Sequence, residues 1–290
     1  MINRLIKHLS EERDFHIKKG SIKNIGGGCI NNSSKIEIEN GDFFCLKWRD
    51  SSPKRFFSSE AKNLQEISHT KTIKVPSPII WEDNFENGGF LVLEWIEFSR
   101  NEKSASKLGE DLAKMHQIHK NEFGFGFDNF IGSTNQINSW KKDWIEFFIE
   151  NRLDYQFKLL EKKNLINVEF GRMFDLLLGQ AKKITGNVNE KPSLLHGDLW
   201  SGNWGWEMNG NPVIFDPACY YGNREADLAM MELFGSPGYR FWERYNECLP
   251  LKEGYRERMD FYNLYHILNH ANLFGENYLF QAESIIRKYI

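Results

Sequence analysis

The chain has 290 residues, of which 41% are hydrophobic and 14% aromatic, enough for well-filled interiors and better suited to two lobes than to one compact core. Its formal net charge of −3 excludes the strong positive field of proteins that bind nucleic acid or anionic membranes. No apolar run approaches the ~20 residues that a membrane-spanning helix requires.

The N-terminal segment and the cysteines together predict a cytoplasmic protein. Residues 1–9 lack the long apolar core and the small-residue cleavage site of a secretory signal. The cysteines contain no C-x-x-C pair, which argues against a zinc site and against a disulfide framework. They are scattered along the chain at Cys29, Cys45, Cys219 and Cys248.

The first third of the chain is rich in predicted strands. A short amphipathic helix near Ile2–Leu9 precedes a strand over Phe15–Ile25, which enters the glycine triplet Gly26-Gly27-Gly28. A helix is predicted over Pro53–Ile67, because proline suits the first turn of a helix. The other predicted strands are Lys35–Glu39, Phe43–Trp48, Ile79–Glu82 and Phe90–Trp95.

Helical spacing of apolar residues dominates beyond residue 100. One helix is predicted around Leu108–His116 and another around Trp144–Asn151, with Ser139 as its cap. Further helical patterns cover residues 168–184, 225–234, 255–273 and 278–289. With a join near Trp95–Arg100, these patterns predict an α+β chain. A strand-rich lobe at 1–95 and a helical lobe at 96–290 are expected to face each other across a cleft.

One segment carries most of the functional signal. Residues 196–203 read HGDLWSGN, and residues 213–216 read VIFD. Asp198 can accept the proton of an attacking hydroxyl, whereas Asn203 and Asp216 offer the hard oxygen ligands that Mg²⁺ prefers. Kinases carry this pattern as an H-x-D loop with Asn five residues after the Asp, followed by a metal-binding Asp. The segment therefore predicts a phosphoryl-transfer site.

The dipeptide Asn209-Gly210 predicts how these side chains meet. It is a strong signal for a two-residue hairpin loop, because both turn positions need positive φ. Such a loop would pair Asn203 directly with Asp216 at the open end of the hairpin. The alternative is that both residues merely flank a surface hairpin.

The triplet Gly26-Gly27-Gly28 joins two predicted strands. Glycines there let a backbone fold closely over phosphates and present N–H groups to them. The sequence matches neither G-x-x-x-x-G-K-[ST] nor G-x-G-x-x-G, so a P-loop or Rossmann site is not expected. An ordinary flexible turn is the alternative.

Lys47 follows an apolar strand and can reach the α- and β-phosphates of a nucleotide as a point charge. Glu60, on the next predicted helix, is expected to hold Lys47 in place, with Glu66 as its rival. Backbone groups around Glu94 and Ile96, where the first lobe ends, can hydrogen-bond an adenine. The alternatives are an exposed lysine and a plain buried strand.

At this point the chain resembles the fructosamine kinase (ketosamine kinase) family, a branch of the aminoglycoside-phosphotransferase-like and protein-kinase-like fold. The similarity spans nearly the whole chain, and its last two segments are the most specific. The matching segments are GGGCI at 26–30, LGEDLA at 108–113, NSW at 138–140, LHGDLWSGN at 195–203 and DPACYYGNREADLAM at 216–230.

The resemblance implies a bilobal kinase that uses ATP and Mg²⁺ to phosphorylate the C3 hydroxyl of ketosamines. The implied acceptors are ribulosamine, erythrulosamine or fructosamine adducts of small amines or of protein lysines. The phosphorylated adduct falls apart and frees the amine, so the implied role is protein deglycation. Asp198 matches the catalytic base, and Asn203 and Asp216 match the metal ligands. Lys47 matches the phosphate-binding lysine, with Glu60 as its partner.

The resemblance also brings Trp200 into the site, where an aromatic face can pack on the C–H groups of a sugar. The alternative is a core tryptophan that anchors the loop. Asp227 is expected to cap a helix; the alternatives are that Glu225 and Asp227 brace the loop or face the substrate amine. The chain departs from protein kinases after Asp216, where Pro217-Ala218 replaces Phe-Gly, so a flipping activation segment is not expected.

Several competing interpretations stay open. Another small-molecule kinase, of the aminoglycoside or choline kinase type, would carry the same motifs. A nucleotide-binding pseudokinase predicts loss of a catalytic residue, but none is lost. Cys29 in the glycine loop is a candidate redox switch. His266 and His270 have i, i+4 spacing but no third metal ligand, so packed histidines are expected. The sequence leaves the oligomeric state undetermined.

Overall fold

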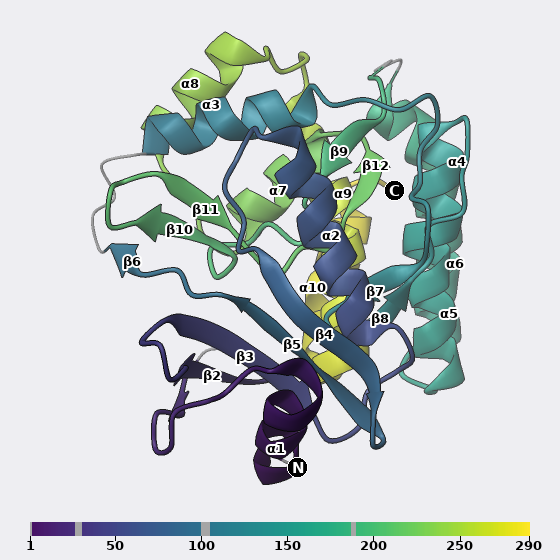
Figure 1. Cartoon of the computed structure of the whole chain (residues 1–290). Coiled ribbons are helices and arrows are strands. Elements are labelled where there is room, and N and C mark those ends of the chain that lie inside the picture. Colours follow the sequence, from purple (N-terminus) through teal and green to yellow (C-terminus); the bar gives the residue numbers. More distant parts are fainter. Residues whose placement is uncertain (1, 27–30, 100–104, 187–189) are drawn as a thin grey trace.

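The structure is a computed structural model that describes residues 2–26, 31–99, 105–186 and 190–290. An antiparallel sheet near the N-terminus lies beside a larger, mainly helical region that also holds small two- and three-stranded sheets (Figure 1). The α+β class predicted from the sequence is confirmed. Within the described residues, no helix is long and apolar enough to cross a membrane.

The N-terminal sheet is antiparallel throughout and has the strand order β1-β2-β3-β5-β4. Helices α1 (Ile2–Arg13) and α2 (Phe56–Thr70) pack on it in two different hydrophobic clusters (Figure 1). The strands are β1 (Lys23–Asn24), β2 (Asn32–Glu37), β3 (Phe43–Arg49), β4 (Pro78–Phe85) and β5 (Gly88–Glu94).

Burial alternates along the interior strand β5 and assigns each sheet face to one helix. Phe90 and Val92 are buried with α1, whereas Leu91 and Leu93 are buried with α2, as the two-residue period of a strand requires. Lys47 on β3 pairs in register with Leu91 and therefore lies on the α2 face. This register turns the Lys47 side chain toward α2 and the helical region.

The helical region is built around α9 (Tyr255–Phe274), which contacts α5, α6, α7 and α10. Most residues of α9 are buried, including polar ones such as Asn263, His266 and Asn269. The other helices are α3 (Ala105–His116), α4 (Trp144–Phe148), α5 (Tyr155–Lys162), α6 (Val168–Thr185), α7 (Glu225–Leu233), α8 (Tyr239–Cys248) and α10 (Asn277–Arg287).

Short strands in the helical region carry the loops of the predicted site. Strand β9 (Ser193–Leu195) pairs with β12 (Tyr220–Gly222), and β7 (Asn129–Ile131) pairs with β8 (Thr134–Gln136). Strand β10 lies between β11 and β6 in a three-stranded sheet. These strands are β6 (Phe98–Ser99), β10 (Trp204–Glu207) and β11 (Pro212–Ile214).

Two predicted boundaries in the first lobe are wrong for backbone reasons. The strand expected over 15–25 is reduced to β1 and an isolated bridge at Ile17, because a turn with Gly20 at φ 77° interrupts it. The helix expected from Pro53 begins only at Phe56, because Arg55 is left-handed at φ 66° and cannot continue a helix.

Three features of the helical region also differ from the prediction. Asp143, not Ser139, caps α4, because its carboxylate accepts from the Glu146 N–H at 2.8 Å. A π-helical segment (Ile149–Asp154) continues α4 into α5. Helices α5 and α8 were not predicted from the sequence.

Candidate active site

We call residues 196–203, which lie between β9 and β10, the catalytic-type loop. Two of its residues, Asn203 and Asp198, are hydrogen-bonded to each other. The Asn203 side-chain amide donates to the Asp198 main-chain carbonyl at 2.8 Å and to the Asp198 carboxylate at 3.3 Å. Because both N–H groups of the carboxamide are used in this way, its oxygen remains for another partner, such as a cation.

The β10–β11 hairpin has a register that differs by one residue from the prediction. Trp204 pairs with Ile214, so Asn203 lies opposite Phe215, whose N–H donates to the Asn203 carbonyl at 3.0 Å. The prediction that Asn203 pairs with Asp216 is wrong. The loop holds three residues, 208–210, and only Gly210 has positive φ, at 87°. This is the three-residue hairpin in which glycine takes the left-handed position.

Two residues of the site have left-handed backbone. Asp216 has φ 58° and Gly197 has φ 83°. A Cβ at Gly197 would clash with the carbonyl of Ala218, because the two segments meet where the Ala218 N–H donates to the His196 carbonyl at 2.8 Å. A non-glycine residue in this region persists only where its surroundings impose it. The position of Asp216 is therefore set by contacts of its neighbours.

His196 connects the loop to the strand that precedes Asp216. Its Nε2 donates to the Phe215 carbonyl at 2.9 Å, and its Nδ1 accepts from the Asp198 N–H at 3.2 Å. One donating and one accepting nitrogen describe a neutral imidazole. Burial accordingly lowers the pKa of His196. No role was predicted for His196 from the sequence, although its place in the H-x-D motif was the available signal.

Asp227 on α7 braces the loop, which was the alternative to the helix cap; the expectation of a cap on its own helix is wrong. Its carboxylate accepts from the backbone N–H groups of His196 at 2.7 Å and Gly197 at 2.8 Å. It also contacts His116 Nε2 at 3.2 Å. Although burial opposes ionisation, these donors lower the pKa of Asp227. The carboxylate therefore acts as an ionised anchor for the loop.

Lys47 lies between two carboxylates. Its Nζ is 2.6 Å from Glu60 Oε1 and 2.5 Å from Asp216 Oδ1. Burial opposes the ammonium charge, but Asp216 and Glu60 together raise the pKa of Lys47. Glu66, the rival of Glu60, instead accepts from the Tyr221 hydroxyl at 2.8 Å. The predicted lysine and the second predicted metal ligand thus contact each other directly.

The electrostatics around Asp198 suit proton transfer. Burial first, and then the negative charges of Asp216 and Asp227, raise the pKa of Asp198 to about 7. A general base is most effective when its pKa lies near the operating pH. The carboxylate at the predicted base position can therefore both take up and release a proton near neutrality.

The glycine triplet is only partly described by the structure. Gly26 is exposed, and a Cβ added there would meet no atom within 4 Å. Gly27 and Gly28 lie outside the described residues, as does Cys29 with its predicted redox role. The candidate phosphate contacts of this loop therefore remain predictions.

The segment predicted to hold adenine begins where β5 ends. The Glu94 carboxylate accepts from Lys74 Nζ at 2.6 Å and from the Ser77 N–H at 3.1 Å, and the Glu94 N–H donates to the Ser77 carbonyl at 2.8 Å. Ile96 is buried. The side chain of Glu94 therefore stabilises the connector, and its predicted backbone contacts with adenine remain predictions.

Trp200 is half-buried and lies across its own loop. A Cβ added at Gly202 would clash with the six-membered ring of the Trp200 indole. Gly202 therefore lets the indole approach the loop closely. This contact fits the anchoring interpretation.

The site offers two oxygen donors, which suits Mg²⁺ with water and phosphate as further ligands better than a metal ion whose ligands all come from the protein. Asn203 offers a carboxamide oxygen, and Asp216 offers a carboxylate that is 45% exposed. Among the described residues, no group of three or more His, Cys, Asp or Glu could hold a metal ion. Mg²⁺ is typically bound by one or two carboxylates together with waters and substrate phosphates.

His270 stacks on Phe274 and Tyr278, as expected for a packed histidine.

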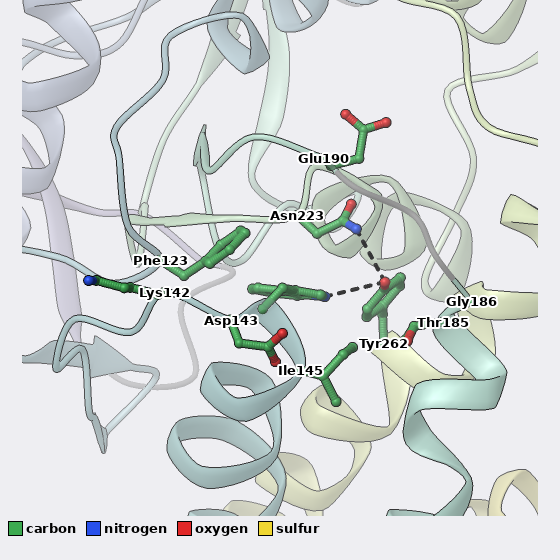
Figure 2. A pocket seen from close by; sticks show the side chains of 10 residues that line it. Phe123, Lys142, Asp143, Ile145, Thr185, Gly186, Glu190, Asn223 and Tyr262 are labelled. Atoms are coloured by element: carbon green, nitrogen blue, oxygen red, sulfur yellow. Dashed lines mark hydrogen bonds between the residues drawn. The ribbon is translucent and has the colours of Figure 1, made fainter.

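A cavity of about 300 Å³ lies away from all of these residues (Figure 2). Part of its polar lining is already paired, because the Tyr262 hydroxyl accepts from Trp144 Nε1 and Asn223 Nδ2, each at 3.3 Å. Glu190 binds Arg224 at 3.1 Å. The cavity includes none of the predicted site residues.

Comparisons with known proteins agree over the full chain. The sequence model of the family described as fructosamine kinase matches residues 1–290. A chloroplastic protein-ribulosamine 3-kinase of Arabidopsis thaliana is 42% identical over 284 residues, covering 97% of this chain and 86% of the relative. A Vibrio parahaemolyticus protein assigned as a ketoamine kinase is 41% identical over 269 residues, covering 92% and 91%.

Similarity to solved structures agrees with the sequence comparisons. A Thermobifida fusca protein assigned as a fructosamine-3-kinase matches with a TM-score of 0.87 at 29% identity, covering 99% of this chain and 98% of that chain. A thermostable mutant of the aminoglycoside phosphotransferase APH(4)-Ia, in complex with AMP-PNP and hygromycin B, matches with a TM-score of 0.66 at 13% identity. The match covers 98% of this chain and 97% of that chain and shows a shared fold. The predicted aminoglycoside-phosphotransferase-like fold is thus confirmed, and the chain belongs to the fructosamine kinase family.

Proposed function

We propose that this protein is an ATP-dependent kinase that phosphorylates the C3 hydroxyl of ketosamines. Its acceptors are ribulosamine, erythrulosamine or fructosamine adducts of amines or of protein lysines, and its role is protein deglycation in the cytoplasm. Family membership and the 42% identity to a ribulosamine 3-kinase support this proposal. The single observation that carries it is Lys47, held between Glu60 and Asp216.

In this proposal the site residues divide the work. Asp198 is the catalytic base, and Asn203 and Asp216 hold Mg²⁺, which supplies neutralisation of phosphate charge. Lys47, held by Glu60, binds the α- and β-phosphates. Gly26, Gly27 and Gly28 cover the phosphates, and backbone groups at Glu94 and Ile96 bind adenine. The nucleotide lobe is residues 1–95, and residues 96–290 form the catalytic and substrate-binding lobe.

The mechanism relies on positioning rather than covalent chemistry. Asp198 accepts a hydrogen bond from the sugar hydroxyl and takes its proton as the phosphoryl group transfers. The Asn203 amide keeps the Asp198 carboxylate oriented through the 3.3 Å contact. Lys47 counters negative charge at the phosphates. Trp200 borders the acceptor sugar, where its ring packs on C–H groups.

The base assignment is tested with Asp198→Asn. The substituted side chain keeps the shape and cannot accept the proton, so kcat is expected to fall by about 10²–10⁴-fold. Nucleotide affinity, measured by calorimetry, is expected to stay within twofold because Asp198 acts on the acceptor. A variant with near-normal turnover would overturn the assignment.

The acceptor class is tested by metal-dependent ATP turnover on ketosamines, choline and aminoglycosides. We expect turnover on ribulosamines and no comparable turnover on the other two classes. Efficient phosphorylation of choline or an aminoglycoside would favour the other small-molecule kinases. ATP binding without turnover on any acceptor would favour a pseudokinase.

A further inference from the structure

The backbone that follows Asp216 is held by three buried carboxamides. The Pro217 carbonyl accepts from Asn63 Nδ2 at 2.9 Å. The next two carbonyls, of Ala218 and Cys219, accept from Gln136 Nε2 at 2.9 Å and from Asn129 Nδ2 at 2.8 Å. Three consecutive carbonyls thus bind three different side chains from α2, β7 and β8. We call Asn63, Asn129 and Gln136 the carboxamide clamp.

The clamp residues also bind one another. Asn129 Nδ2 donates to Asn63 Oδ1 at 3.1 Å, and Gln136 Nε2 donates to Asn129 Oδ1 at 2.7 Å. The Tyr265 hydroxyl donates to Gln136 Oε1 at 2.8 Å. All three carboxamides are at most 1% exposed. A buried network in which every member is satisfied is rigid, and one missing donor leaves a buried carbonyl without a partner.

Apart from its ion pair with Lys47, Asp216 has little support of its own. Its carboxylate is 45% exposed and its φ is 58°, so packing of the side chain does not determine where it lies. Before Asp216, the Phe215 N–H is bound to the Asn203 carbonyl. After it, the clamp binds the next three carbonyls. Both backbone neighbours of Asp216 are therefore restrained by hydrogen bonds, which fix the backbone from which its carboxylate reaches Lys47.

One face of helix α2 contacts both Lys47 and the chain segment that follows Asp216. Glu60, Asn63 and Glu66 are spaced by three residues and bind Lys47, the Pro217 carbonyl and the Tyr221 hydroxyl in that order. The helix that holds the phosphate-binding lysine thus also holds the backbone of the metal-binding aspartate.

We propose that the carboxamide clamp positions Asp216 for binding the catalytic Mg²⁺ and keeps α2 attached to the Asp216 segment. This inference rests on the proposed function. The clamp residues touch neither substrate nor nucleotide in this account, so they are positioning residues. Their loss is expected to weaken metal binding in the nucleotide complex more than it weakens the fold.

The test uses Asn63→Asp in the full-length protein. This change preserves the size of the side chain and its acceptor for Asn129, but removes the N–H groups that bind the Pro217 carbonyl. Mn²⁺ serves as the probe, titrated by electron paramagnetic resonance with a non-hydrolysable ATP analogue. We expect Mn²⁺ affinity to fall about tenfold, whereas analogue affinity in EDTA stays within twofold.

A matched control separates positioning from stability. Asn272→Asp alters an asparagine on α9 that is also nearly buried and donates to the carbonyls of Gln156 at 3.0 Å and Leu268 at 3.2 Å. It is expected to lower thermal stability without changing Mn²⁺ affinity. Gln136→Glu, which removes the donor to the Ala218 carbonyl, is expected to weaken Mn²⁺ binding as Asn63→Asp does.

The outcomes are distinguishable. Wild-type Mn²⁺ affinity in folded Asn63→Asp and Gln136→Glu would overturn the clamp proposal and leave the proposed function intact. An equal loss of Mn²⁺ affinity in Asn272→Asp would also overturn it, because the effect would then follow stability alone. Failure of the wild-type protein to bind the metal–nucleotide complex would overturn the proposed function and the clamp together.

Discussion

At the scale of single residues, Lys47 depends on Glu60 for half of its counter-charge. Glu60→Gln leaves the buried ammonium with Asp216 alone, so Lys47 is expected to turn further toward Asp216 and away from the phosphates. We predict that kcat/KM for ATP falls at least about tenfold, equivalent to ~1.4 kcal/mol. Steady-state kinetics at saturating acceptor measure it.

Glu66→Gln is the matched control for this prediction. Glu66 lies on the same helix but binds the Tyr221 hydroxyl, an interaction that a glutamine carbonyl can also accept. Its effect on kcat/KM for ATP is expected to stay below about twofold. Equal effects of the two substitutions would contradict the distinct role given to Glu60.

The contact between Trp200 and Gly202 yields a second prediction at this scale. Gly202→Ala places a methyl group where the indole lies and must displace the ring. If the ring borders the acceptor, Gly202→Ala and Trp200→Ala both raise the KM for the ketosamine several-fold, with nucleotide affinity unchanged.

The control for that pair is Gly179→Ala on α6, where an added Cβ meets no atom within 4 Å. It is expected to stabilise the helix by about 0.5–1 kcal/mol and to leave acceptor kinetics unchanged. A purely anchoring tryptophan would show itself as lost thermal stability in Trp200→Ala without any change in acceptor KM.

At the scale of elements, α7 supports the catalytic-type loop through Asp227. Asp227→Asn replaces an ionised acceptor of two backbone N–H groups by a neutral one in a buried site. We predict a loss of about 1–3 kcal/mol in the free energy of unfolding and a lower kcat. Urea denaturation followed by circular dichroism measures the first quantity.

Asp143→Asn provides the comparison for this element. Asp143 also accepts a backbone N–H, but it does so at the exposed cap of α4, where asparagine is an equally good cap. Its effect on stability is expected to be close to zero. A similar loss in both variants would argue against a special role for the buried carboxylate.

The elements also show what the sequence could and could not predict. Local periodicity predicted most helices and strands, and the ordered motif predicted which side chains lie near one another. The predicted register of the β10–β11 hairpin was wrong because Asn209-Gly210 suits two loop lengths. The structure uses the three-residue loop. The sequence has no local signal that distinguishes the two loops.

The carboxamide clamp was missed for a different reason. Asn63 and Pro217 are 154 positions apart, and Gln136 and Ala218 are 82 apart. A buried amide has the same composition as a surface amide, and only tertiary packing makes it a backbone partner. The i, i+3 spacing from Glu60 to Asn63 was the only hint on the sequence.

At the scale of the whole molecule, buried neutral histidines make stability depend on pH. Burial lowers the pKa of His266 to about 3 from an ordinary value of 6.5. Below pH 6.5 the unfolded chain therefore binds a proton that the folded protein does not, so the free energy of unfolding falls as pH falls. This group alone is expected to remove ~1.4 kcal/mol between pH 7.5 and 5.5.

Urea denaturation at these two pH values tests this prediction. His266→Gln is expected to lose about 1.4 kcal/mol less than the wild-type protein over the interval. His69→Gln, at an exposed position on α2, is the control and is expected to keep the wild-type pH dependence. An unchanged pH dependence in His266→Gln would show that His266 does not resist protonation in the fold.

The most direct measurement of the central claim is the fate of the γ-phosphate. The protein is incubated with ATP, Mg²⁺ and a ribulosamine, and the product is followed by phosphorus–proton correlation NMR. The account predicts a phosphate ester on the C3 oxygen that requires the acceptor and Mg²⁺ and is lost in Asp198→Asn. A phosphate on another hydroxyl, or ADP formation that is indifferent to the ribulosamine, would contradict it.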